Sequence, residues 1–545
     1  MVPGILYGLS SCVELMRQPV KVIDLFAGPG GLGEGFSACR PNEKQAFKIA
    51  ISIEKEESAH RTLLLRAFFR QFKHEDVPEE YYAFLRGELG KHPEDELYEI
   101  PELAKPLEEA RKEAKQLTLG EDNPKIYKKI REAIGSDECI LIGGPPCQAY
   151  SLVGRSRNYG AKDKKYSATE DHRNFLYLEY LKIIAKFQPM VFVMENVKGM
   201  LSAKVDGKLI FESIRNDLQE PNKYSNAKPE PGREKHKYRI YSFVARPGKL
   251  DLSDNKPLDP HDFIIRMEDY GLPQARHRVI LLGIREDIDS STGHFTRLQA
   301  ENHKPTVRQV TSDLPRLRSR LSKGADSTQA WRDNIDDTGG NTVSELDQDP
   351  LVPDKVYNDL IHQLDTIKNS PSSTGADKGL QKEKLFDQEL PAILQSWYKD
   401  DRLAKYVLNH EARGHIAGDL FRYIYYSTFA QSMKVSPNSK NLPKALWPAH
   451  KNFGSGKFAD RFRVQLADNP GTTVTCHISK DGHYFIHYDP NQCRSLTVRE
   501  AARIQTFPDN YYFVGNRTQQ YVQVGNAVPP YLATLIADIV RKLIS

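Results

Sequence analysis

Short apolar runs alternate with polar and glycine-rich stretches along much of the chain. These runs cover residues 20–26, 49–53, 140–142, 191–194 and 279–284. Short runs without a polar side predict strands that are buried on both faces, as in a parallel sheet. Between two of them, over residues 176–187, apolar side chains recur at helical spacing. This alternation of strand and helix predicts an α/β fold with a doubly wound sheet.

The pattern changes after residue 315. Strand-like runs are hard to find between residues 316 and 491, and polar stretches interrupt this part of the chain. We therefore expect a first domain over residues 1–315 and a second, smaller domain over residues 316–491. Within the first domain, the Lys- and Glu-rich residues 57–138 predict an insertion of surface helices, because charge runs usually form solvated faces.

The last part of the chain is regular again. Thr497 and Glu500 have the spacing of a capping box at the start of a helix. A turn then leads into a final helix, in which apolar residues between Leu532 and Val540 line one face. We expect residues 492–545 to return to the first domain, because this apolar face needs a core to cover it.

The composition narrows the classes of function. The 545 residues carry a formal net charge of +5, which allows a polyanionic partner without requiring one. The six cysteines form no CxxC pair, so we expect reduced thiols, a cytoplasmic location and no metal site. Because no apolar run reaches transmembrane length and residues 1–19 lack the features of a signal peptide, we expect no membrane association.

A glycine-rich turn follows the first predicted strand. Phe26, Gly28 and Gly30 lie in it, and such a turn before a helix lets a ligand approach the backbone closely. Glu54 ends the second predicted strand, where a carboxylate accepts hydrogen bonds from ribose hydroxyls in doubly wound folds. A solvated charge is the alternative for Glu54. The turn is not a strict GxGxxG, but together with Glu54 it favours a nucleotide-like ligand.

Cys147 lies on a turn that contains two glycines and two prolines. Such a turn is rigid and non-helical, so a thiol held on it can serve as a nucleophile. The commoner fate of a free cysteine is a small buried hydrophobe, and the turn alone leaves both possibilities open. The basic residues 152–167 predict a lid that meets phosphates, with a plain surface loop as the alternative.

Further polar side chains leave the same edge of the predicted sheet. Glu195 and Asn196 follow the apolar run at residues 191–194, and carboxyl ends of parallel strands are where such folds place their sites. Arg276 and Arg278 alternate along one predicted strand and would therefore share a face. Two arginines on one face suit a carboxylate, a phosphate or a base edge, with a structural salt bridge as the alternative for one of them.

The second predicted domain has basic residues close to aromatic ones. His410, Arg413 and His415 precede a stretch that contains Phe421 and Tyr423. The cysteine and histidines between residues 476 and 487 match no zinc-binding spacing, so we expect no metal there either.

Six blocks of sequence, in this order, resemble the DNA cytosine-5 methyltransferases. They are residues 24–31, 143–151, 195–197, 274–278, 499–508 and 523–530. The resemblance implies a Rossmann-like catalytic domain that uses S-adenosylmethionine and acts on double-stranded DNA. It also implies that the variable residues 316–491 form the target-recognition domain.

The resemblance implies roles for individual residues. Cys147 would add to C6 of cytosine as the nucleophile, Glu195 would serve N3 as an acid or hydrogen-bond donor, and Arg278 would hold O2. Arg276 would support them as a further catalytic residue. The residues implied around the cofactor are Phe26, Gly28, Gly30, Glu54, Asp122, Leu176, Asn526 and Ala527. Those implied around the flipped base are Gln148, Ser151 and Asn196. The stretch around Asp122 departs from the family's usual third block.

Three other functions are alternatives. One branch of the resembled family methylates tRNA, although the large second domain favours DNA, because reading base edges needs added surface. A non-catalytic DNA-binding protein with the same fold is disfavoured by the intact Cys147, Glu195 and Arg278. A dinucleotide-dependent oxidoreductase would leave the turn around Cys147 unexplained. We expect a monomer that acts beside a restriction or other phage-defence system.

Overall fold

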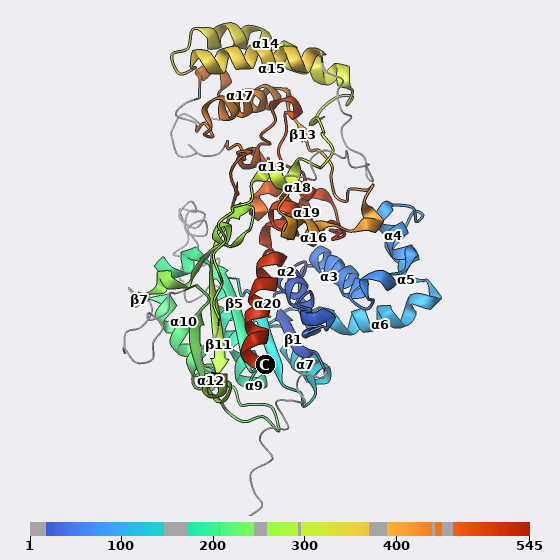
Figure 1. Cartoon of the computed structure of the whole chain (residues 1–545), viewed down its shortest axis with the longest axis vertical. Helices are drawn as coiled ribbons and strands as arrows, with labels where there is room; N and C mark the ends of the chain where they lie inside the picture. The colour runs from blue at the N-terminus through green and yellow to red at the C-terminus, as the bar shows by residue number, and fades with distance from the viewer. Residues whose placement is uncertain are drawn as a thin grey trace, which may run out of the picture.

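The computed structural model describes residues 18–146, 172–205, 208–244, 259–292, 296–369, 390–438, 442–448 and 462–545. An eight-stranded sheet lies at its centre (Figure 1). The strand order is β3-β2-β1-β4-β5-β11-β8, with β9 paired to β11. The strands are β1 (Val20–Leu25), β2 (Phe47–Glu54), β3 (Ala114–Gln116), β4 (Cys139–Gly143), β5 (Val191–Val197), β8 (Tyr238–Ser242), β9 (Ile264–Arg266) and β11 (His277–Arg285).

The strand directions determine which residues meet at one edge of the sheet. The strands from β3 to β5 are parallel, whereas β11 runs antiparallel to β5. The chain progresses outward from β1 to β3 and then crosses to β4 and β5, so the strand order reverses between β1 and β4. Because β11 is antiparallel, its first residues lie beside the carboxyl end of β5, and Arg278 pairs with Val197.

Helices cover both faces of the sheet, because the alternation of side chains along each strand sends apolar residues to both sides. Val22 belongs to a core formed with α2 (Gly31–Ser37) and α20 (Pro530–Ile544). The neighbouring Ile23 belongs to a second core on the opposite face. The helices of that face are α7 (Asn123–Ile134), α9 (His172–Phe187) and α10 (Ile210–Gln219). The doubly wound α/β fold predicted from the sequence is confirmed.

Residues 57–138 are more than an insertion of surface helices, and this corrects the prediction. Their segment Ala114–Gln116 forms the edge strand β3, which pairs with β2. It has no apolar run that could have revealed it, because pairing with a neighbour decides such a short strand. The helices of this part also form a separate core, to which Leu403, Leu408 and Val514 from later in the chain contribute. They are α3 (Glu57–Phe69), α4 (Glu79–Arg86), α5 (Pro93–Tyr98) and α6 (Ala104–Glu113).

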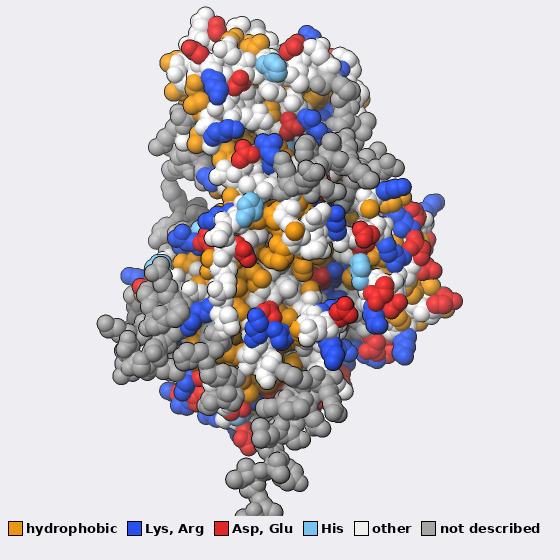
Figure 2. All heavy atoms as spheres, in the orientation of Figure 1, with side chains coloured by type: hydrophobic (Ala, Val, Ile, Leu, Met, Phe, Trp, Pro, Cys, Tyr) orange, Lys and Arg blue, Asp and Glu red, His pale blue; other side chains and the backbone are white. Residues whose placement is uncertain are grey.

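The outer surface of α4, α5 and α6 carries acidic and basic side chains side by side (Figure 2). Arg86 of α4, for example, forms ion pairs with Glu79 and Glu88 at 2.6 Å. This arrangement agrees with the prediction that the charge runs of this part form solvated faces.

A separate group of helices lies at the far end of the molecule from the sheet (Figure 1). These helices, α14 (Thr328–Asp347), α15 (Asp354–Asn369) and α17 (Ala417–Met433), share one apolar core. The aromatic residues of α17 belong to that core, so they do not form a surface of aromatic and basic residues. The boundaries of a second domain stay a prediction, and α16 (Ala392–Tyr398) packs on the core of the sheet instead.

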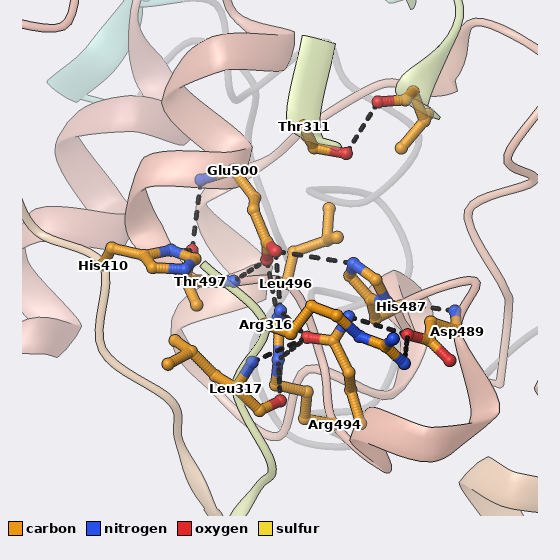
Figure 3. A network of polar contacts seen from close by, with 12 residues as sticks. Thr311, Arg316, Leu317, His410, His487, Asp489, Arg494, Leu496, Thr497 and Glu500 are labelled. Atoms are coloured by element: carbon orange, nitrogen blue, oxygen red, sulfur yellow. Dashed lines mark hydrogen bonds and ion pairs between the residues drawn. The ribbon is translucent and has the colours of Figure 1, made fainter. Parts of the chain in front are cut away.

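A buried polar network lies around the start of α18 (Figure 3), and Ser427 of α17 reaches it by donating to the carbonyl of His487 at 2.8 Å. Glu500, in α18 (Val498–Ile504), accepts two hydrogen bonds from Arg494 at 2.6 and 2.7 Å. Arg494 also donates to the carbonyl of Leu317 at 3.0 Å. His410 hydrogen-bonds Thr497 at 2.9 Å. Three segments that are distant in the sequence are therefore held together at one point. The predicted capping box of Thr497 and Glu500 is confirmed.

The remaining helices and short strands connect these parts. The helices are α11 (Pro221–Ser225), α12 (Glu286–Thr292), α13 (Val307–Thr311) and α19 (Arg517–Asn526). The strands are β6 (Lys204–Val205), β7 (Lys208–Leu209), β10 (Gln274–Ala275), β12 (Arg320–Leu321), β13 (Gly414–His415) and β14 (Gly471–Thr472). Within the described ranges, no helix combines the length and the apolar character needed to cross a membrane.

The final helix returns to the first part of the chain, as predicted, and two glycines of α2 allow its close approach. A Cβ atom added at Gly31 would lie 2.2 Å from the carbonyl oxygen of Val528. One added at Gly35 would lie 2.4 Å from the Cβ of Ala533 in α20. The contact between α2 and α20 therefore has no room for any larger residue at these positions.

We predict that Gly35→Ala destabilises the protein by about 1–3 kcal/mol, because the new methyl group forces α2 and α20 apart. The matched control is Gly340→Ala, in the exposed part of α14, where an added Cβ meets no atom within 4 Å. This control should gain about 0.5–1 kcal/mol from the higher helix propensity of alanine. Urea denaturation measures both values, and equal stability of Gly35→Ala and the wild type would contradict the packing described.

Candidate active site

The glycine-rich turn after β1 borders open space. Phe26 has φ +56° and Gly28 has φ +57°, and the left-handed region is rare for an aromatic residue. A Cβ added at Gly28 would meet no atom within 4 Å, so the backbone is accessible there. Gly30, with φ +100°, differs: a Cβ there would lie 2.9 Å from Leu63. The structure thus leaves room for a ligand at Gly28, while Gly30 serves the close packing of the turn.

Glu54, at the end of β2, ties its strand to the glycine turn. Its carboxylate accepts hydrogen bonds from the backbone N–H groups of Gly28 at 2.8 Å, Lys55 at 2.9 Å and Glu56 at 2.8 Å. Burial raises the pKa of Glu54, and these three donors oppose that rise. The carboxylate lies beside the open space at Gly28.

The end of α19 meets the same turn from the other side. Asn526, the last residue of α19, is exposed, and Ala527 after it is buried. The next residue, Val528, touches Gly31 at the start of α2. Residues that are about five hundred positions apart in the sequence therefore lie in contact just after the glycine turn.

Glu195 and Arg278 form an ion pair at the carboxyl edge of the sheet. Their closest atoms, Oε1 and Nε, are 3.0 Å apart, and their side chains are 14% and 13% exposed. Glu195 comes from β5 and Arg278 from the start of the antiparallel β11. Burial lowers the pKa of Arg278, and the charge of Glu195 opposes that shift. The position of Glu195 at the carboxyl end of β5 agrees with the sequence prediction.

The turn that leads to Cys147 is held against this ion pair. A Cβ added at Gly144 would lie 2.9 Å from Oε2 of Glu195, so only glycine fits there. The side chain of Asn196 donates to the carbonyl of Pro145 at 3.2 Å. Asn196, predicted to touch the base, thus holds the turn in the structure. Cys147, Gln148, Ser151 and the predicted lid at 152–167 lie outside the described residues.

Arg276 does not share a strand with Arg278. It lies between β10 and β11, and its guanidinium donates to the backbone carbonyls of Val474 at 2.6 Å and Ala527 at 3.1 Å. The exposed fraction of Arg276 is 2%. The predicted shared face is therefore corrected: Arg278 pairs with Glu195, whereas Arg276 binds the chain at the end of α19. The alternation failed as a guide because the two arginines lie on either side of a strand boundary.

Asp122 and Leu176, which were also predicted to contact the cofactor, have partners within the protein. The carboxylate of Asp122 accepts a hydrogen bond from the backbone N–H of Thr118 at 3.0 Å, within the turn between β3 and α7. That carboxylate therefore already has a partner inside its own turn. Leu176, in α9, is half-buried and packs against the second core of the sheet.

Asp24 is a buried acid that the functional prediction did not use. It lies in β1 beside Ser52 of β2, and both are 0% exposed. No side chain among the described residues hydrogen-bonds the carboxylate of Asp24 or the hydroxyl of Ser52, and the backbone N–H of Gly33 lies close to that carboxylate. Burial raises the pKa of Asp24 to about 8, although the charge of Arg70 opposes the rise. A polar residue in an otherwise apolar strand was the available signal. Among the described residues, no group of three or more potential ligands could hold a metal ion.

Comparison with known proteins gives matches along most of the chain. The family model described as C-5 cytosine-specific DNA methylase matches residues 111–228 and 260–542. Type II methyltransferase M.Bpa9945I of Bacillus paralicheniformis is 31% identical over 540 residues, which cover 96% of this chain and 99% of that protein. Putative type II methyltransferase M.OihORF3336P of Oceanobacillus iheyensis is 24% identical and covers 98% of each chain. DNA (cytosine-5-)-methyltransferase M.ApeKI of Aeropyrum pernix is 25% identical, over 75% of this chain and 82% of that protein.

We predict that Asp24→Asn stabilises the protein at pH 8 and not well below pH 3.8. Well below pH 3.8, Asp24 holds its proton in both states. Between its ordinary pKa of 3.8 and its folded pKa of about 8, only the unfolded chain releases the proton, so stability falls as the pH rises. The loss is on the order of a few kcal/mol by pH 8 and is absent from the variant. Urea denaturation across this pH range checks it, and a pH-independent difference between the two proteins would contradict it.

Proposed function

The chain belongs to the C-5 cytosine-specific DNA methylases and is a DNA cytosine-5 methyltransferase of the type II restriction-modification kind, and we propose how its residues carry out that reaction at one specific duplex sequence. The observation that supports the proposal is the ion pair of Glu195 and Arg278, which lies against the turn that leads to Cys147. It places an acid, a cation and the start of the nucleophile's turn at one edge of the sheet.

The chemistry requires a nucleophile because C5 of cytosine is itself a poor one. We assign this role to Cys147: its thiolate forms a bond to C6, and the electron pair of the C5–C6 bond makes C5 nucleophilic. After C5 has received the methyl group, it loses its proton, the C5–C6 double bond re-forms and the thiolate leaves. Through the carbonyl of Pro145, Asn196 holds the start of the turn on which Cys147 lies.

Glu195 and Arg278 stabilise the charge that develops when the thiolate adds. Negative charge builds up toward N3, where Glu195, once it has taken up a proton as the base enters, supplies that proton or a hydrogen bond, and at O2, where Arg278 donates. Before cytosine enters, the two side chains satisfy each other at 3.0 Å, which keeps two largely buried charges paired. Entry of the base replaces part of this pairing with contacts to the base.

We propose that S-adenosylmethionine binds along the glycine turn and the end of α19, because Gly28 leaves its backbone accessible and Glu54 presents a carboxylate beside it. When bound, this cofactor supplies a methyl group on a sulfonium. Glu54 would bind the ribose hydroxyls, Phe26 and Leu176 would contact the adenosine, and Asn526 with Ala527 would bind the amino-acid end. We keep Asp122 as a weaker adenine contact, since its carboxylate already caps a turn.

The substrate is duplex DNA, so the target cytosine must leave the base stack before Cys147 can reach C6. We propose that Gln148 and Ser151 contact the flipped base. Reading a specific sequence needs side chains at base edges, and we assign this to residues 316–491. We expect the protein to act as a monomer, alongside a restriction endonuclease or another phage-defence system.

We predict that Cys147→Ser abolishes methyl transfer and leaves the affinity for S-adenosylmethionine within about twofold of the wild type, because a hydroxyl is far less acidic than a thiol. Cys139→Ala is the control, since Cys139 lies buried at the opposite end of β4 and should keep its activity per folded enzyme. Transfer of a labelled methyl group to DNA measures activity, and calorimetry measures cofactor binding. A Cys147→Ser enzyme that methylates at the normal rate would exclude Cys147 as the nucleophile.

We predict that Glu195→Gln lowers kcat about 100-fold or more without changing cofactor affinity, because an amide cannot donate a proton to N3. Glu138→Gln is the matched control: it makes the same change in an ion pair with Arg285, at 2.8 Å, at the other edge of the same sheet. Single-turnover methylation of duplex DNA by the two variants gives the comparison. Equal effects of the two substitutions on kcat would contradict a role of Glu195 in the chemical step.

A further inference from the structure

Arg276 binds the end of α19 through a set of backbone carbonyls. Besides Val474 at 2.6 Å and Ala527 at 3.1 Å, its guanidinium lies 3.4 Å from the carbonyl oxygen of Gly525. The last carbonyls of a helix have no partner within the helix. A planar guanidinium with several fixed donors can bind such a group of carbonyls and hold them in one arrangement.

Gln505 binds the same turn from a different element. It follows α18, is 0% exposed, and donates to the carbonyls of Val524 at 2.7 Å and Ala527 at 3.3 Å. Its side-chain oxygen accepts a hydrogen bond from Gln274 at 2.8 Å. Gln274 in turn accepts from the N–H of Val474 at 2.7 Å. Arg276, Gln505 and Gln274 thus form one connected, buried network.

The backbone around this network is closely packed. A Cβ added at Gly525 would lie 2.3 Å from the backbone of Thr475 and Cys476. On the other side of the turn, Val528 lies against Gly31 of α2. The position of Asn526, exposed between these fixed neighbours, is therefore set by side chains that do not themselves face the open space at Gly28.

We propose that Arg276 and Gln505 are positioning residues for cofactor binding, which hold residues 525–527 in place, and that Arg276 takes no part in contacting the base. This inference rests on the proposed function, because it assumes that Asn526 and Ala527 bind the cofactor's amino-acid end. Arg276 and Arg278, which lie close together in the sequence, then act on different ligands. Arg278 serves the base through its pairing with Glu195, and Arg276 serves the cofactor through the end of α19.

The test separates cofactor binding from attack on the base. Calorimetry with S-adenosylmethionine, without DNA, measures the first. The second is measured without cofactor, as the release of tritium from C5 of cytosine in bulk duplex DNA: addition of the thiolate to C6 lets C5 take up a solvent proton, and loss of the tritium precedes departure of the thiolate. The variants are Arg276→Lys, which keeps the charge but not the fork of donors, and Gln505→Met, which keeps the length of the side chain. Arg278→Lys is the matched comparison.

We expect Arg276→Lys and Gln505→Met to raise the Kd for S-adenosylmethionine about tenfold, the effect of losing one or two hydrogen bonds, with tritium release within about twofold of the wild type. Arg278→Lys should show the reverse. Loss of tritium release in Arg276→Lys at unchanged Kd would overturn the proposal, because Arg276 would then belong to the base pocket. A parallel fall of both readouts, with a lower unfolding midpoint, would also overturn it, because the residue would then only maintain the fold. A wild-type protein that binds no S-adenosylmethionine would instead contradict the proposed function itself.

Discussion

The close contact between α2 and α20 is the constraint on which the cofactor side of the site depends. Gly31 and Gly35 give α2 a face without side chains, and the last helix fits against it at backbone distance. This contact brings the turn before α20 to the glycine turn after β1. Two segments at opposite ends of the sequence thus meet, and Arg276 and Gln505 hold the second of them by donating to its backbone carbonyls.

A second constraint acts on the base side. Because β11 runs antiparallel to its neighbour, the start of β11 and the end of β5 meet, and Arg278 reaches Glu195 across the two strands. The turn that leads to Cys147 lies at the same edge. Asn196 holds this turn by donating a hydrogen bond to the carbonyl of Pro145. The antiparallel direction of β11 therefore places the guanidinium of Arg278 beside the carboxylate of Glu195. The polar junction around Glu500 connects this sheet to the far group of helices, to which we assign target recognition.

The sequence predicted most of what depends on local pattern. The apolar runs gave the central strands, and the capping box of Thr497 and Glu500 has the predicted geometry. What depends on tertiary pairing was not predictable in this way. The edge strand β3 has no apolar run, and the partners of Arg276 come from residues far along the chain. The aromatic residues of α17 stand near basic residues in the sequence, but they fill a core, because aromatic side chains bury large areas wherever helices converge. Asp24 was visible only as a polar exception in an apolar strand.

Sequencing of host DNA after bisulfite-type conversion, with and without expression of the protein, tests the central claim most directly. Cytosine methylated at C5 resists conversion, so a cytosine-5 methyltransferase with a specific target leaves protected cytosines in one short recurring sequence. The account predicts that pattern in the expressing cells alone. Equal conversion of DNA from both kinds of cells would contradict it, and methylated cytosine in tRNA from the same cells would then identify RNA as the substrate.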